Sequence, residues 1–166
     1  MPSRLQVAPD EYLSMSFDGV DREYVRGEIV ERSMPDYAHG KMQLRLGARF
    51  VQLEESHRLF ACSETRMQLA PDLYRIPDIA VFAETEPDKP VPKHPPLLVI
   101  EIVSPDDRYS DVLEKLAQYQ QWGVPHIWVV DPHKRTLAAY ADGVLSLAPK
   151  LTLPGCPLEL SEDLFS

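Results

Sequence analysis

The sequence has few of the features that mark exported, membrane-spanning or disulfide-bonded proteins. Its two cysteines, Cys62 and Cys156, lie far apart, and it has no CxxC or Cys/His cluster, so neither a disulfide framework nor a zinc site is expected. No apolar run approaches the roughly 18 residues that span a bilayer, and residues 1–10 lack the apolar core of a signal peptide. We therefore expect a cytoplasmic protein without a membrane segment.

Positive charge is also scarce. The chain has 17 Lys and Arg residues against 26 Asp and Glu residues, which gives a formal net charge of -9. Because Lys and Arg supply the general attraction of proteins for phosphates, this balance argues against a broad electrostatic surface for nucleic acid. If DNA is the substrate, basic residues should gather locally on one face; the candidates are Arg66, Arg75, Lys93, Arg108 and Lys115.

The chain does have enough apolar material for one hydrophobic core. Of its 166 residues, 44% are hydrophobic and 26% are charged, and no internal repeat or linker composition interrupts them. We therefore expect one domain over residues 1–166.

Hydrophobic periodicity and turn residues predict a mixed order of helices and strands. The expected helices span residues 8–15, 36–56 and 106–123, and the expected strands span residues 22–25, 28–31, 58–62, 65–69, 74–82, 97–103, 126–131, 136–140 and 144–147. Asp36 is the expected cap of the second helix, and the tail from Pro149 should lie over the body. This order predicts an α/β fold, in the sense of a mixed α+β sheet, with one sheet and a helix on each face.

Two of these helices carry apolar residues three and four positions apart, which indicates the face that each buries. On the second helix these residues are Met42, Leu46, Phe50 and Leu53. On the third helix they are Tyr109, Leu113, Leu116 and Ala117.

Two carboxylates interrupt apolar strands and form the first site hypothesis. Asp78 precedes Ile79 to Phe82, and Glu101 lies within Leu97 to Val103. Burial of an unpaired carboxylate is disfavoured by several kcal/mol or more, roughly, so each needs a partner. One interpretation is that a divalent cation binds both acids. The other is that each acid has a purely structural partner, namely backbone N–H groups for Asp78 and a Lys or Arg for Glu101.

Four blocks carry a resemblance to a known family. They are Pro-Asp at 77–78, Leu-Val-Ile-Glu-Ile-Val-Ser-Pro at 98–105, Asp-Val-Leu-Glu-Lys-Leu-Ala-Gln-Tyr at 111–119, and Gly-Val-Pro-His-Ile-Trp-Val-Val-Asp-Pro at 123–132. In this order they resemble the Uma-two family of the PD-(D/E)XK nuclease superfamily over nearly the whole chain. The resemblance implies a restriction-endonuclease-like core, with a central mixed β-sheet flanked by helices, and a Mg²⁺- or Mn²⁺-dependent endonuclease that hydrolyses DNA.

The resemblance also implies roles for particular residues. Asp78 and Glu101 match the two acids of the motif and would hold the metal ion. The motif's lysine is expected at position 103, where this chain has Val103, and Lys115 on the following helix matches the position to which relatives move that role. By helical geometry alone, Lys115 lies off the apolar stripe and could instead pair with Asp111 in solvent.

A third acidic ligand is implied near the N-terminus. Glu28 or Glu31 could supply it, with His39 nearby as an accessory residue. The alternatives are solvated hairpin acids for Glu28 and Glu31 and a surface position at the helix N-terminus for His39.

Two functions of different classes follow. The first is a metal-dependent nuclease, expected to be a homodimer because two copies of one site most simply cut two strands. The second is a non-catalytic binding or regulatory module on a nuclease scaffold, and an enzyme for a small phosphoester is a third possibility.

Overall fold

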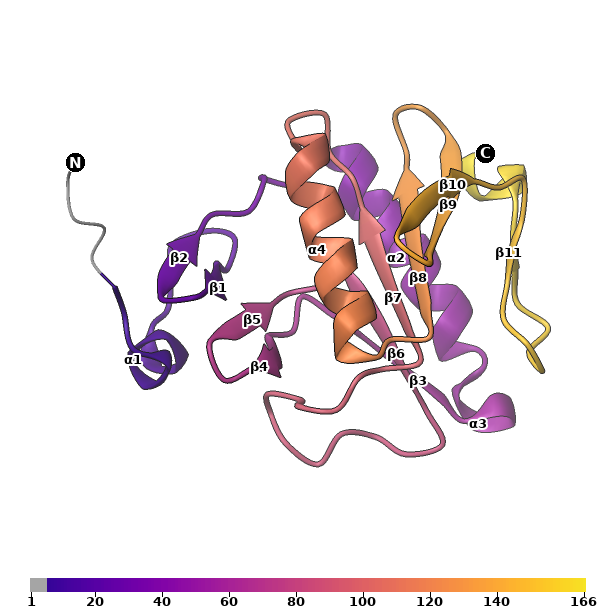
Figure 1. Ribbon diagram of the computed structural model, residues 1–166. Helices are drawn as coiled ribbons and strands as arrows, with labels where there is room; N and C mark the ends of the chain where they lie inside the picture. The colour runs from indigo at the N-terminus through magenta and orange to yellow at the C-terminus, as the bar shows by residue number, and fades with distance from the viewer. Residues whose placement is uncertain (1–5) are drawn as a thin grey trace.

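The structure, a computed structural model, describes residues 6–166 (Figure 1). Its helices are α1 (Pro9–Ser14), α2 (Tyr37–Val51), α3 (Glu54–His57), α4 (Tyr109–Trp122) and the 3₁₀ helix η1 (Glu162–Phe165). Its strands are β1 (Glu23–Val25), β2 (Glu28–Val30), β3 (Leu59–Ser63), β4 (Met67–Ala70), β5 (Leu73–Arg75), β6 (Ile79–Ala83), β7 (Leu98–Ile102), β8 (His126–Asp131), β9 (Thr136–Ala141), β10 (Val144–Leu147), β11 (Leu151–Thr152) and β12 (Glu159–Leu160). In this part of the chain, no helix combines the length and the apolarity needed to cross a membrane.

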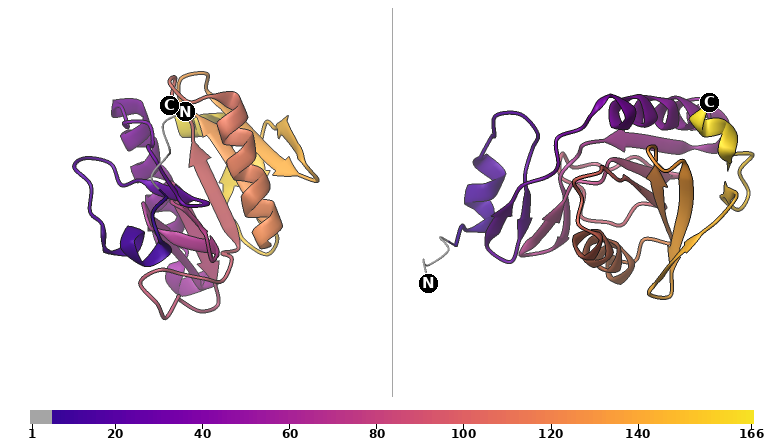
Figure 2. Two further views of the ribbon diagram at one scale, coloured as in Figure 1. Left: turned by 60° about the vertical axis from the view of Figure 1, so that its left-hand side comes forward. Right: turned by 90° about the horizontal axis from the view of Figure 1, so that it is seen from above.

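A six-stranded mixed sheet forms the centre of the molecule, in the order β10-β9-β8-β7-β6-β3. Strand β7 pairs antiparallel with β6 and parallel with β8, and α4 makes the crossover between β7 and β8. Helix α2 covers one face and α4 covers the other (Figure 2). All five residues of β7 are buried, because a strand covered on both faces excludes water from both sets of side chains. This arrangement confirms the predicted mixed sheet flanked by helices.

The prediction of a single sheet was wrong. A second sheet, in the order β2-β1-β5-β4, lies beside the first and packs against α1 through Tyr12, Tyr24 and Tyr74. The expected strand over residues 74–82 is therefore two strands, because β5 belongs to the small sheet and β6 to the large one. Residues 76–78 cross between the sheets, and Pro77, which has no N–H to donate, lies in that crossing.

The helices begin and end at somewhat different residues than expected. Asp36 caps α2 as predicted, accepting a hydrogen bond from the His39 backbone N–H at 2.9 Å, but α2 ends at Val51 rather than near residue 56. Helix α4 begins at Tyr109, three residues later than predicted, and Gly123 ends it in the left-handed conformation (φ 108°) that glycine adopts most readily.

The expected apolar faces are correct for α2 and partly wrong for α4. On α2, Met42, Leu46 and Phe50 are buried. On α4, Tyr109 and Ala117 are exposed, and the fully buried residues are Leu116 and Tyr119. The inward face of α4 is therefore rotated from the predicted stripe toward the side that also carries Lys115.

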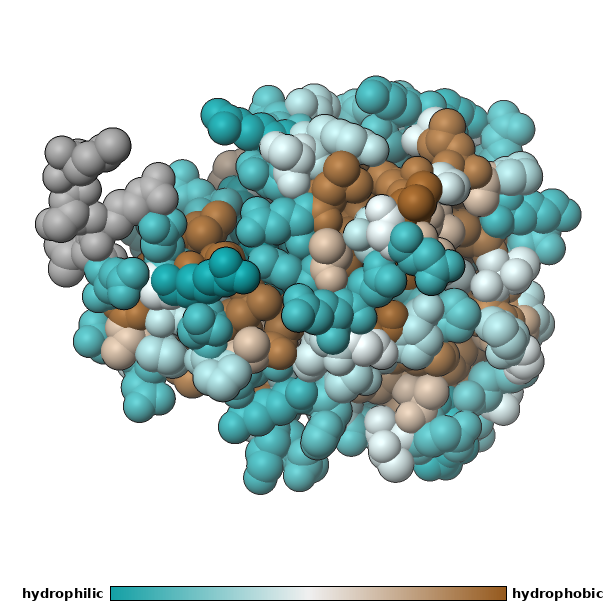
Figure 3. Space-filling view, in the orientation of Figure 1, coloured by the Kyte–Doolittle hydropathy of each residue, from teal (hydrophilic) through white to brown (hydrophobic). Residues whose placement is uncertain are grey.

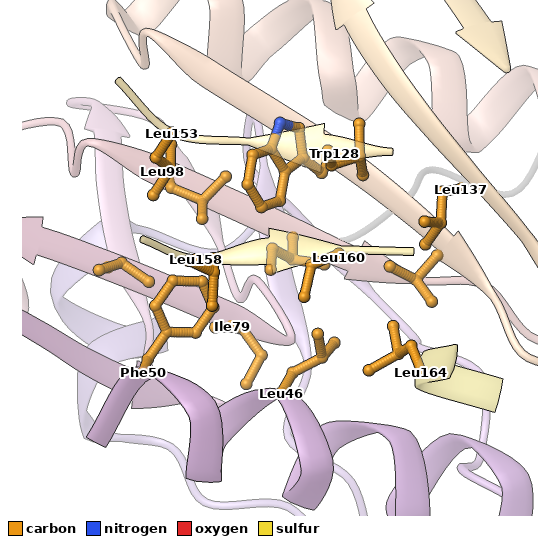
Figure 4. Packing of buried hydrophobic residues seen from close by; sticks show 14 of the residues in the cluster. Leu46, Phe50, Ile79, Leu98, Trp128, Leu137, Leu153, Leu158, Leu160 and Leu164 are labelled. Carbon is orange, nitrogen blue, oxygen red and sulfur yellow. The ribbon is translucent and has the colours of Figure 1, made fainter. Parts of the chain in front are cut away.

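The C-terminal tail, which was expected to lie over the body, forms part of the core. Leu153, Leu158, Leu160 and Leu164 pack against α2 and the α2-facing side of the large sheet (Figure 4). The short β11–β12 pair holds this segment in place. The α2 layer is therefore completed by residues far from α2 in sequence.

Candidate active site

The pairing of β6 with β7 brings Asp78 and Glu101 to neighbouring positions. Ile79 pairs with Ile100, so Asp78, one residue earlier on the antiparallel chain, lies beside Glu101. Alternation along each strand places both side chains on the α4 side of the sheet, with Ala80 and Val99. Asp78 Oδ2 also accepts a hydrogen bond from the Ile102 backbone N–H at 2.7 Å, which ties the two strands together at this point.

Basic groups surround the Asp78 carboxylate. His39 Nε2 lies 3.2 Å from Asp78 Oδ1, and a guanidinium nitrogen of Arg32 lies 3.4 Å from the same oxygen. Burial by itself would raise the pKa of Asp78, but hydrogen bonding to His39 and the charge of Lys115 outweigh it and leave this pKa below its ordinary value. The aspartate therefore remains ionised in spite of its burial.

Glu101 is also buried, but its pKa shifts in the opposite direction. Its Oε1 accepts a hydrogen bond from the Tyr119 hydroxyl at 2.7 Å and lies 3.1 Å from Lys115 Nζ. Burial raises the pKa of Glu101 to about 8; the charge of Lys115 opposes this shift, and the negative charges of Asp78 and Glu23 add to it. The two neighbouring acids thus differ sharply in proton affinity.

Lys115 lies in the cluster of acids and not at the surface with Asp111. Its ammonium group is 2.7 Å from Glu23 Oε1 and 3.1 Å from Glu101 Oε1. Burial would lower the pKa of this lysine, but the carboxylates of Glu101, Glu23 and Asp78 raise it above its ordinary value. Lys115 is therefore a charged ammonium shared between two buried acids.

Glu23 is the residue of the cluster that the sequence did not reveal. It begins β1, is almost fully buried, and accepts hydrogen bonds from Arg75 and from the Ile76 backbone N–H, each at 2.9 Å. The positive charges of Lys115 and Arg75 overcome the effect of burial and hold the pKa of Glu23 below its ordinary value. Since the β1–β5 pairing places Glu23 beside Arg75, only that register distinguishes it from the other hairpin acids.

The other predicted residues lie at different distances from this cluster. His39 is buried and contacts Asp78, and its Nδ1 is a buried atom without a hydrogen-bond partner among the described residues. Glu28 is partly buried and lines the cleft in front of the cluster. Glu31 also borders this cleft, but it is exposed and forms an ion pair with Arg22. Glu23, and not Glu31, therefore reaches Lys115.

The cluster opens into a cleft of about 580 Å³ between the β1–β2 hairpin and α4. Figure 3 shows mainly hydrophilic residues where these two elements meet. Nine acidic residues line the cleft against four Arg or Lys residues. The acids are Glu23, Glu28, Glu31, Asp78, Glu101, Asp106, Asp107, Asp111 and Glu114, and the bases are Arg32, Arg75, Arg108 and Lys115.

The expected basic face is therefore only partly present. Arg75, Arg108 and Lys115 line the cleft as predicted. Arg66 instead forms two 2.7 Å hydrogen bonds to Asp21, and Lys93 borders a separate groove along the proline-rich loop. The prediction was wrong for these two residues, because neither lines the cleft that holds the acids.

The donor set fits a hard divalent cation that keeps part of its water shell. Within residues 6–166, no group of three or more His, Cys, Asp or Glu side chains is arranged to enclose a metal ion. Mg²⁺, however, is commonly bound by one or two carboxylates, with waters and substrate phosphates completing its shell. Asp78 and Glu101 are such a pair. Burial, together with the negative charges of Asp78 and Glu23, raises the pKa of Glu101, and a bound cation would favour its ionised form.

Known proteins resemble this chain in family pattern and in fold. The family model Uma2, described as "Putative restriction endonuclease", matches residues 9–162. The chain is also similar to a crystal structure described as "a putative nuclease belonging to DUF820" from Anabaena variabilis, with a TM-score of 0.81 and 24% identity, covering 96% of this chain and 97% of that chain. A comparison with curated protein sequences gave no match. At this identity, the structural likeness shows the fold.

Proposed function

This chain belongs to the Uma2 family and has a restriction-endonuclease-like fold, and from that premise we propose that it is a divalent-metal-dependent enzyme that hydrolyses phosphodiester bonds in DNA. The observation that carries the proposal is the buried cluster itself. Lys115 lies between Glu23 and Glu101, with Asp78 just before the neighbouring strand, in an open cleft. Burial of several charged groups is unfavourable in free energy, and clusters of this kind are typical of functional sites.

Asp78 and Glu101 are the residues that would hold the metal ion. A Mg²⁺ or Mn²⁺ ion bound there would supply Lewis-acid activation of the scissile phosphate. The hydrogen bonds of Asp78 to Ile102 N–H and His39 hold its carboxylate in place, and Tyr119 does the same for Glu101. His39 is thus a positioning residue for Asp78.

Lys115 is the proposed catalytic cation. Its pKa is raised, so it remains an ammonium at neutral pH and can stabilise negative charge that develops on the phosphate oxygens. Glu23, fixed by Arg75 and by the Ile76 backbone N–H, holds this ammonium at the floor of the cleft. We infer that Glu23 positions Lys115.

Plasmid cleavage with Mg²⁺ or Mn²⁺ tests the proposal. Lys115→Met should lower the cleavage rate by about 10² or more, as loss of a transition-state charge partner does. Lys150→Met is the matched control, because Lys150 lies at the surface beside Glu159. If the Lys115 variant does not fold, the same assay is made on Asp78→Asn, which retains an acceptor for the Ile102 N–H and should also lower the cleavage rate. Unchanged cleavage by a folded Lys115→Met protein would remove the lysine from the mechanism.

A non-catalytic metal-binding module is the second candidate, and the acidic cleft favours it. Nine acids against four bases weaken the attraction for a polyanion. Calorimetric titration with MgCl₂ or MnCl₂, compared between the parent and Glu101→Gln, separates the candidates. Metal binding that depends on Glu101, without cleavage of any DNA, would favour the module over the enzyme.

A further inference from the structure

The outward face of α2 is apolar, although a helix face exposed to water is ordinarily polar. Tyr37, Leu44 and Val51 are 82%, 78% and 60% exposed, and each lies seven residues from the next. At about 100° per residue, these side chains and Ala48 fall within a narrow stripe opposite the buried residues of the helix. Figure 2 shows α2 as the outer layer on its side of the sheet.

Two glycines border this stripe. Gly40 and Gly47 are also seven residues apart, and a Cβ added at either would meet nothing within 4 Å. Glycine within a helix is less favourable than alanine, and no close contact inside the chain requires it here. Missing side chains along one edge of a helix do, however, allow another helix to approach closely.

Charges at the two ends of the stripe complement each other. Lys41 lies near its N-terminal end and contacts the Tyr37 ring, with Nζ 5.9 Å from the ring centroid. Glu54 and Glu55 begin α3 just beyond its C-terminal end. Within residues 6–166, none of these three charged groups has an ion-pair partner.

We propose that this stripe binds the same stripe of a second copy of the chain, with the two α2 helices antiparallel about a two-fold axis. That arrangement places Lys41 of one copy beside Glu54 and Glu55 of the other, twice by symmetry. In this register the two-fold axis passes near Gly47 and Ala48, and Leu44 of each copy lies opposite Val51 of the other. The acidic end of the stripe and the net charge of -9 make an anionic lipid surface a poor alternative.

The interface is independent of the chemistry proposed for the cleft. Helix α2 presents its opposite side to the core, where His39 reaches Asp78. Pairing through the outward face therefore leaves both clefts in place. Loss of cleavage activity and loss of the dimer are consequently separate outcomes.

Sedimentation equilibrium up to about 100 µM protein tests the proposal. The parent should be a dimer, and Leu44→Glu should weaken it by about 30-fold or more, because it puts a carboxylate against the apolar side chain of Val51 on each side of the two-fold axis. Leu147→Glu is the matched control, since Leu147 is similarly exposed but lies on β10. Circular dichroism of each variant should match the parent, because both positions are exposed.

A charge exchange tests the antiparallel orientation. Lys41→Glu should weaken the dimer by about tenfold, and combining it with Glu54→Lys and Glu55→Lys should restore the parent's affinity. Gly47→Ala should stabilise the monomer yet weaken the dimer. A monomeric parent would overturn the proposal. A dimer weakened by Leu147→Glu and not by Leu44→Glu would also overturn it.

Discussion

A single ammonium group contacts two buried acids. Lys115 contacts both Glu23 and Glu101, and Tyr119, one turn further along α4, donates a hydrogen bond from its hydroxyl to the same Glu101 oxygen. Removing one partner from a buried charge pair typically costs about 3–5 kcal/mol, because the remaining charge is left without compensation. Cleavage assays on variants of this cluster therefore need a parallel measurement of stability.

The Tyr119 hydroxyl should contribute measurable stability. Tyr119→Phe leaves a buried carboxylate oxygen with one donor fewer, and we expect a loss of about 1–3 kcal/mol in the free energy of unfolding. Tyr140→Phe is the matched control, because Tyr140 is similarly buried and its hydroxyl has no hydrogen bond within residues 6–166. Urea denaturation of both proteins checks this. Equal losses would mean that the Glu101 contact contributes nothing of its own.

Among the secondary structure elements, the C-terminal tail has a larger role than its short strands suggest. Its leucines fill the space between α2 and the large sheet, and Arg45 and Arg49 of α2 donate to backbone carbonyls of Leu164 and Glu159. The tail thus fixes the helix that carries His39. Packing of the tail and placement of the site are linked through α2.

Leu160→Ala should therefore lower the stability of the whole fold. Leu160 is fully buried, and replacement of a buried leucine by alanine costs about 2–5 kcal/mol through lost contacts and the cavity left behind. Leu147→Ala, at an exposed position, should change stability by about 0.5 kcal/mol or less. Thermal and urea denaturation measure both. A small effect at Leu160 would show that the tail lies loosely on the core.

For the molecule as a whole, the balance of shifted pKa values predicts a stability maximum in mildly acidic solution. Asp21, Glu23 and Asp78 have lowered pKa values, since their basic partners outweigh burial. Their stabilising effect is present above the ordinary pKa of a carboxyl group and is lost as the pH falls through the lowered values. Stability should therefore fall as the pH is lowered from the maximum.

Glu101 makes the stability of the fold decrease as the pH rises. Its pKa rises from 4.5 in its ordinary state to about 8 in the fold, so between these values the folded protein keeps a proton that the unfolded chain has released. Stability without divalent cations should therefore fall as the pH rises through this window, by at most about 1.4 kcal/mol per pH unit. His39, whose pKa is also raised against the effect of burial, acts in the same direction above its ordinary value of 6.5.

Melting temperatures in EDTA between these pH values test this prediction. Glu101→Gln carries no titrating carboxyl group at this position, so its melting temperature should depend less steeply on pH than that of the parent. Added Mg²⁺ should raise the parent's melting temperature most at the upper end of the range, where a bound cation favours the ionised carboxylate. Identical pH profiles for the parent and the Glu101→Gln protein would contradict the shift.

The sequence by itself determined the features that depend on neighbouring residues. The apolar run around Glu101 predicted a buried central strand. Because a carboxylate in an apolar run must have a partner, Asp78 and Glu101 were predicted to be site residues. The cap at Asp36 and the end of α4 at Gly123 also follow from local chemistry. The four sequence blocks identified the family, which the match over residues 9–162 confirms.

Only the tertiary structure decided which distant residues complete the cluster. Glu23 and Arg75 are 52 residues apart, and the pairing of β1 with β5 brings them together. Local periodicity predicts which strands are buried, but long-range packing sets the strand register. The sequence pattern therefore could not distinguish Glu23 from Glu28, and it could not show that the chain passes from one sheet to the other at Pro77. The same long-range packing turned Lys115 inward, because the acids it meets lie on two different sheets.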